Sequence, residues 1–266
     1  MGEMPNIQIL MATMFKSKLD DINWSSKGVV SDVILINQGD FEGVEQSEQV
    51  KMVSTQERGS SKSRNLALKH ADGDICIIAD DDVSYLSGYE EIIRKAYEDY
   101  PDADIITFQI QTTEGNPFKG NYITEARKHT ALSVLKCASI EITFKNQSIR
   151  EAGLNLDLEF GLGSKYRVHD EIIFLKDALD AGLRCYYVPV PIVVHPPESS
   201  GTDYNQDLLY SKGAAFYRLF GIKGLAFDLI FSIKKHNEYK GKFSFIECLR
   251  LMVKGTLEYR EEHING

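Results

Sequence analysis

Residues 72–88, "DGDICIIADDDVSYLSG", join an apolar run to a cluster of like charges. The mostly apolar residues 75–79 lead directly into three aspartates, Asp80, Asp81 and Asp82. Adjacent carboxylates repel one another, and burial without partners is costly for each of them. The pattern predicts a buried strand that ends at a ligand-binding rim, where positive charge is expected.

Similar apolar runs on both sides of this strand predict an α/β fold. We expect strands at 6–13, 31–37, 49–55, 73–80 and 103–110, helices at 60–71, 88–100 and 169–182, and an extended stretch at 183–197. Strands that alternate with helices form βαβ units and a mostly parallel sheet, which binds ligands beyond the carboxyl ends of its strands. The irregular segment 111–168 is predicted as loops, and the chain from 203 onward as helices.

Composition narrows the class of protein. The chain has 266 residues and a formal net charge of −9, which argues against a nucleic-acid backbone as its main partner. Its four cysteines form no C-x-x-C pair, so we expect reduced thiols rather than a zinc or redox motif. Neither a signal peptide nor a membrane-spanning run is predicted, so the expected location is cytoplasmic.

The aspartate triplet by itself leaves three interpretations open. Carboxylates after a strand bind Mg²⁺ or Mn²⁺ in phosphoryl or glycosyl transfer. A calcium loop of the EF-hand kind fails, because the required Gly and Glu positions are absent. A solvated turn is the third interpretation.

The segment "SKSRNLALKHADGDICIIADDDV", residues 61–83, resembles glycosyltransferase family 2, which has the GT-A fold. The family pattern matches in order at Arg64-Asn65, Ala67, Ala71, Gly73-Asp74 and Asp80-x-Asp82. The resemblance implies a mixed, mostly parallel nucleotide-sugar-binding sheet flanked by helices, with a helical C-terminal tail. It also implies that Asp80 and Asp82 are the D-x-D pair and that Asp81 lies between them at the donor.

Two further parts of the family pattern are recognisable. Thr13 ends the first strand as in the family, and Asn37 stands where the family has an Asp that contacts the base. The family also carries a Glu-Asp pair eleven residues before a helix-ending Gly. Counting back from Gly182 places Glu171 at the Asp and Asp170 at the Glu, so the order of the two acids is reversed.

The resemblance implies a role for each of these residues. Asp82 would hold a Mn²⁺ or Mg²⁺ ion, with Asp80 on the ribose or on the water shell of the metal. His195 would complete the metal site or serve the fold alone, and Arg64 would contact the donor or make a surface ion pair. Glu171 is the expected catalytic base, and Asp170 stays open as the alternative.

The family implies an inverting transferase that uses a UDP-sugar, or a dTDP-sugar, and a glycan or lipid-linked acceptor in bacterial surface polysaccharide synthesis. A non-catalytic sugar-nucleotide-binding protein and a nucleotidyltransferase are the alternatives. We expect a catalytic domain at 1–200, with a donor half at 1–110 and an acceptor half at 111–200, and a helical extension at 201–266. Three contacts stay open for that extension: the inner face of the membrane, a second subunit in a homodimer, or the catalytic domain.

Overall fold

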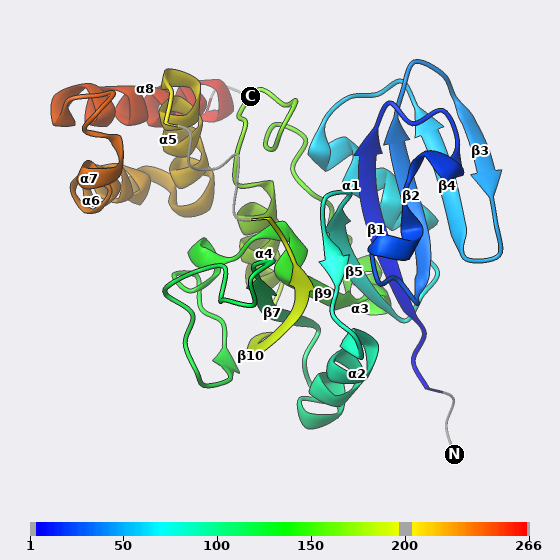
Figure 1. The fold of residues 1–266 in the computed structure, drawn as a ribbon. Helices are drawn as coiled ribbons and strands as arrows, with labels where there is room; N and C mark the ends of the chain where they lie inside the picture. The colour runs from blue at the N-terminus through cyan, green and yellow to red at the C-terminus, as the bar shows by residue number, and fades with distance from the viewer. Residues whose placement is uncertain (1–3, 197–203, 265–266) are drawn as a thin grey trace. The chain divides into compact units, whose positions relative to one another are not determined.

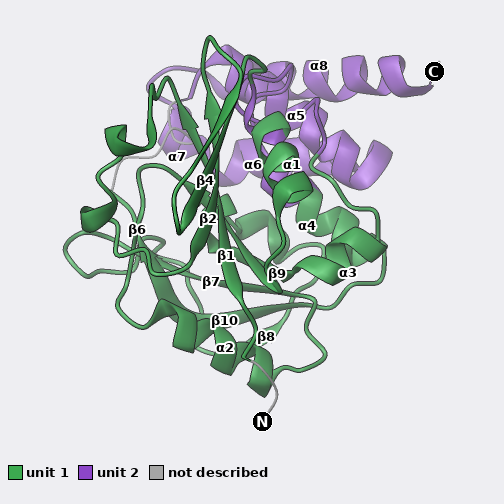
Figure 2. Cartoon of the chain, turned by 90° about the vertical axis from the view of Figure 1, so that its right-hand side faces the viewer, with its two compact units in different colours: residues 1–58, 62–156, 174–198 green, residues 59–61, 157–173, 199–266 purple. Residues whose placement is uncertain are grey.

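The computed structural model describes residues 4–196 and 204–264, which form two compact units (Figures 1 and 2). Unit 1 comprises residues 1–58, 62–156 and 174–198, and unit 2 comprises residues 59–61, 157–173 and 199–266. The domain boundary expected at 200/201 lies outside the described residues.

Unit 1 is built on one mixed sheet of ten strands in the order β3-β4-β2-β1-β5-β9-β7-β10-β6, with β8 paired to β10. Its longer strands are β1 (Ile7–Met14), β2 (Asp32–Gln38), β4 (Val50–Thr55), β5 (Ile75–Asp80), β7 (Ile105–Gln111) and β10 (Cys185–Val194). The shorter ones are β3 (Gly43–Gln46), β6 (Ser84–Tyr85), β8 (Arg127–Lys128) and β9 (Ile142–Lys145). Strands β4, β2, β1 and β5 pair in parallel, as do β7 and β10, so the expected α/β fold is confirmed.

Helices cover both faces of this sheet, which explains why its central strands are apolar throughout. These helices are α1 (Ser60–His70), α2 (Tyr89–Asp99), α3 (Asn146–Glu151) and α4 (Asp170–Asp180). Alternate residues of β5 point to opposite faces: Ile77 joins the core under α2, whereas Ile78 joins the core under α1 and α4. Because the strands are buried from both sides, their charged groups are confined to the ends.

Residues 206–264 of unit 2 are mostly helical. They contain α5 (Gln206–Phe220), α6 (Gly224–Lys234), α7 (His236–Tyr239) and α8 (Phe245–Ile264), as the sequence predicts. The backbones of α5 and α8 meet at two glycines. A Cβ on Gly213 would lie 1.8 Å from the carbonyl oxygen of Met252, and one on Gly255 would lie 2.0 Å from that of Tyr210. Any side chain at either glycine would force the two helices apart.

The structure differs from the sequence-based expectation in the segment 111–168. This segment is not loop throughout: it contributes β9, which lies antiparallel between β5 and β7, and it also contributes α3. Strand β9 therefore joins the parallel strands of the first half of the sheet to the β7–β10 pair, within the central core rather than at its surface.

Candidate functional site

The carboxyl ends of four parallel strands place polar side chains in one row. In the strand register Ser54 lies beside Asn37, Asn37 beside Thr13, and Ala12 beside Asp80. The residues expected at the donor, Thr13, Asn37 and Asp80, are thus brought to one edge of the sheet in unit 1. This edge is where α/β sheets bind their ligands.

Each of the three aspartates at this edge has a positively charged or hydrogen-bonding partner. These partners compensate for the repulsion between the adjacent carboxylates. Asp80 accepts a hydrogen bond of 3.0 Å from the guanidinium of Arg64, whose side chain is only 9% exposed. The second carboxylate oxygen of Asp80 accepts a longer bond of 3.5 Å from the Ser139 hydroxyl. Arg64 is therefore not a surface residue with a loose ion pair: α1 fixes it against Asp80 from below the rim.

Asp81 is held by two residues from the first part of the chain. Its carboxylate accepts a hydrogen bond from the Thr13 hydroxyl, and its backbone oxygen accepts one from the Lys27 ammonium. Burial lowers the pKa of Lys27, and the negative charges of Asp81 and Asp82 partly offset this effect. Lys27 could not be singled out from the sequence, because no motif links it to a triplet more than fifty residues away.

Asp82 is the most open of the three and faces His195. The side chain of Asp82 is 57% exposed, and its carboxylate lies 3.4 Å from Nε2 of His195, which is 13% exposed. The ring of Phe118 packs edge-on against that of His195, with centroids 5.2 Å apart. Asp82 and His195 thus come together from distant segments of unit 1, and Phe118, which the sequence did not single out, packs against the imidazole.

Asn37 is buried and its side-chain amide is occupied within the chain. It accepts a hydrogen bond from the Lys16 amide, donates one to the Lys16 carbonyl oxygen and donates another to the Ser54 hydroxyl. In this arrangement Asn37 fixes the loop that follows β1 rather than presenting its amide to solvent.

Two side chains at this rim suit a divalent cation. Carboxylate oxygen and imidazole nitrogen are both ligands for Mn²⁺, and metal ions in nucleotide sites take their other ligands from phosphate and water. Asp82 and His195 lie close enough to share one ion, whereas Asp80 is engaged by Arg64. Over residues 4–196 and 204–264, no group of three or more His, Cys, Asp or Glu side chains converges as a metal site.

The acids expected to provide the catalytic base begin α4, and their first-turn side chains belong to unit 2. Asp170 is only 4% exposed, and one of its carboxylate oxygens accepts from the hydroxyls of Ser60 and Ser61 at 3.2 and 3.4 Å. A Cβ on Gly161, whose φ is +100°, would clash with both Ser60 and Asp170. Asp170 is thus locked into the local structure, while the adjacent Glu171 is half-buried.

Glu171 lies in the electrostatic field of a buried lysine. Burial lowers the pKa of Lys212 to about 8, and the negative charge of Glu171 partly offsets this decrease. The Lys212 ammonium lies 3.2 Å from Nε2 of His169, the residue before Asp170, which has a left-handed φ of 72°. His169 and Lys212 therefore define the turn from which α4 and its two acids begin.

The mixed, mostly parallel sheet flanked by helices matches the GT-A class of folds. The chain is similar to S. aureus TarS residues 1–349, with a TM-score of 0.59 and 12% identity over 98% of this chain and 91% of that one. A second structure of the same TarS segment, in complex with UDP-GlcNAc, gives 0.60 and 13% with the same coverage. Full-length TarS gives 0.58 and 13%, over 96% of this chain and 54% of that one.

Residues 36–154 match the family model described as Glycosyl transferase family 2. This match and the fold confirm the resemblance to glycosyltransferase family 2 that the sequence shows. Among curated protein sequences none matches the chain. None of the helices in the described residues is both long enough and apolar enough to cross a membrane.

Proposed function

We propose that the protein is an inverting glycosyltransferase that moves a sugar from a UDP-sugar to a hydroxyl of a glycan or lipid-linked acceptor in surface polysaccharide synthesis. The observation that supports this most is the rim of unit 1, where Asp80, Asp81 and Asp82 end a buried strand and each meets a positive or hydrogen-bonding partner. The UDP-GlcNAc complex of the similar TarS segment supports a UDP-sugar as the donor class.

The donor would lie across the strand ends. Arg64 would hold Asp80 in position to accept from the ribose hydroxyls, since its guanidinium donates a charge-assisted hydrogen bond to that carboxylate. Asn37, through its bonds to Lys16, would shape the loop against which the base rests. In this arrangement Thr13 acts through Asp81, not on the donor directly.

Asp82 and His195 would hold a Mn²⁺ or Mg²⁺ ion. When bound, such an ion offsets the negative charge that grows on a departing diphosphate. The residues of the chain contribute the rest: Phe118 orients the imidazole of His195, and the Lys27 ammonium donates to the backbone oxygens of Asp81 and Val83.

A carboxylate at the start of α4 would remove the proton from the acceptor hydroxyl as that oxygen attacks the anomeric carbon from the face opposite the diphosphate. We assign this role to Glu171, because the carboxylate of Asp170 is already bound by Ser60 and Ser61. We propose that residues 1–110 bind the donor and that residues 111–200 contribute the acceptor side.

A thermal-shift screen of nucleoside diphosphates tests the donor class. UDP with Mn²⁺ is expected to raise the melting temperature, because a ligand at about 100 times its Kd stabilises a folded protein by about 2.7 kcal/mol. dTDP should give a smaller shift, and GDP, whose larger base has a different hydrogen-bonding edge, none. Absence of a shift with all three nucleotides, with and without Mn²⁺, would contradict the proposal.

We further propose that α6 rests on an anionic membrane surface, where a lipid-linked acceptor would be found. The burial pattern of this helix is the reverse of the usual one, in which apolar side chains are buried. Gly224, Asp228 and Ser232 are buried, whereas Leu229, Ile230 and Ile233 are 44%, 44% and 60% exposed. Lys223 and Lys234 at its ends are exposed and would meet anionic headgroups.

Sedimentation with anionic vesicles at low salt tests this placement. The wild-type chain should pellet with the vesicles, and Ile230→Ser/Ile233→Ser should reduce the bound fraction at least about tenfold, since it removes most of the apolar area. Leu158→Ser/Leu162→Ser, which removes two exposed leucines elsewhere, is the matched control. Failure of the wild-type chain to sediment would end the proposal.

A further inference from the structure

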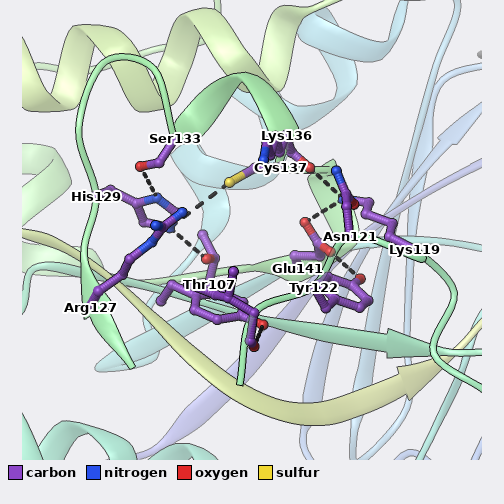
Figure 3. Close-up of a pocket in the computed structure, with 12 residues that line it drawn as sticks. Thr107, Lys119, Asn121, Tyr122, Arg127, His129, Ser133, Lys136, Cys137 and Glu141 are labelled. Atoms are coloured by element: carbon purple, nitrogen blue, oxygen red, sulfur yellow. Dashed lines mark hydrogen bonds and ion pairs between the residues drawn. The ribbon is translucent and has the colours of Figure 1, made fainter. Parts of the chain in front are cut away.

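A cationic cavity in unit 1 takes no part in the donor site described above, which is built on Asp80, Asp81 and Asp82 (Figure 3). About 40 Å³ of it is open to the centres of water molecules, which is room for about three waters or for one phosphate-sized group. Its wall comes from β7, β8, β10 and the segment 119–141, the part of the chain expected on the acceptor side.

The wall carries three cations and one acid. The acid, Glu141, is only 2% exposed and already engaged: it accepts from the Lys119 ammonium at 2.7 Å, from the Ala138 amide and from the Tyr122 hydroxyl. Figure 3 shows Lys119 and Tyr122 converging on this carboxylate. Glu141 and Lys119 therefore neutralise each other.

Arg127 and Lys136 remain as excess positive charge at the cavity. Across the described ranges neither side chain makes an ion pair. The buried His129 adds no charge near neutral pH, because burial and the charge of Arg127 lower its pKa to about 4. Two exposed cations without an ion pair beside a small cavity, in a chain whose net charge is −9, favour an anionic ligand there.

Residues close in sequence to two that line the cavity reach the strand-end aspartates and His195. Ser139, two residues before Glu141, donates to Asp80. Phe118, the residue before Lys119, packs on His195, which faces Asp82. A group bound in the cavity would thus lie near the donor site.

We propose that this cavity binds a phosphate ester carried by the acceptor, with Arg127 and Lys136 as its cationic contacts. The inference rests on the proposed function, since it assumes that the adjacent rim binds the donor. Guanidinium and ammonium groups together suit a phosphate, to which arginine offers a paired fork and lysine a compact charge. The acceptor class is then a phosphate-bearing glycan, polyol or lipid rather than a neutral sugar.

Calorimetry with glycerol 3-phosphate and inorganic phosphate, at low salt and without nucleotide, tests the proposal. Glycerol 3-phosphate should bind the wild-type chain, and Arg127→Gln/Lys136→Gln should weaken it at least about tenfold. Lys240→Gln/Arg260→Gln removes the same charge from exposed positions of unit 2 and should leave the affinity unchanged. Melting temperatures of both variants verify that they fold.

Three results would overturn the inference. One is equal binding of glycerol 3-phosphate by the cavity variant and the wild-type chain. Another is binding of inorganic phosphate alone, which would mean that the cavity does not admit an ester. The third is displacement of glycerol 3-phosphate by UDP, which would assign the cavity to the donor. UDP binding by the cavity variant is measured in parallel, so that failure of the donor proposal is seen separately.

Discussion

Replacement of Glu171 by glutamine is expected to lower kcat for sugar transfer at least about 10²-fold, while UDP affinity stays at its wild-type value. General base catalysis contributes about 10²–10⁴-fold, and an amide of the same shape cannot accept the proton. Glu171 is half-buried, whereas Asp170 is bound by Ser60 and Ser61. Transfer rates and calorimetry with UDP check the two halves of this expectation.

Asp170, the acid next to Glu171, serves as the internal control for this prediction. Asp170→Asn should lose less rate and chiefly raise the KM for the acceptor, because it weakens the serine bonds that fix the start of α4. Asp207→Asn, at an exposed acid in the first turn of α5, should leave transfer unchanged. A near-normal kcat in Glu171→Gln combined with collapse in Asp170→Asn would reverse the assignment, and normal rates in both would remove the pair from the mechanism.

Asp82→Asn is expected to reduce transfer more than tenfold and to abolish the part of UDP stabilisation that depends on Mn²⁺. The carboxylate of Asp82 is the most open of the triplet and faces His195, so its charge is the one available to a cation. A tenfold loss corresponds to roughly 1.4 kcal/mol in the activation barrier. Activity assays and thermal shifts with and without Mn²⁺ measure the two effects.

Asp99→Asn, at an exposed acid at the end of α2, is the matched control and should behave as wild type. If Asp82→Asn keeps more than about a tenth of the wild-type rate, Asp82 is not the principal metal ligand. Retention of the Mn²⁺-dependent shift with loss of transfer would place the role of Asp82 at the sugar instead.

The sequence predicts the parallel half of the sheet well, because strands such as β1 and β5 are apolar runs that end at turn or charged residues. The four-residue β9 escapes prediction, since "ITFK" is too short for a periodic signal and lies in a polar segment. Its place between β5 and β7 is set by pairing with residues far along the chain. β10 is similarly irregular, with shifts in its register on β7 around Pro191.

The residues of the candidate site likewise divide into those that the sequence predicts and those that only the folded structure brings together. The triplet, Arg64 and His195 can be singled out by spacing and residue type. Lys27, Phe118 and Ser139 cannot, because their contacts with the triplet or with His195 exist only once distant segments meet. The same holds for Ser60 and Ser61, whose hydrogen bonds to Asp170 also join distant segments of the chain.

The four cysteines differ in burial, so they differ in their reactivity toward thiol reagents. Cys76, Cys185 and Cys248 are buried, and burial raises the pKa of the first two to about 12, so their thiols are poorly reactive at neutral pH. Cys137 alone is partly exposed, and it lines the cationic cavity next to Lys136. A maleimide dye would therefore label the native chain at one place, and its fluorescence would report cavity occupancy without any engineered mutation.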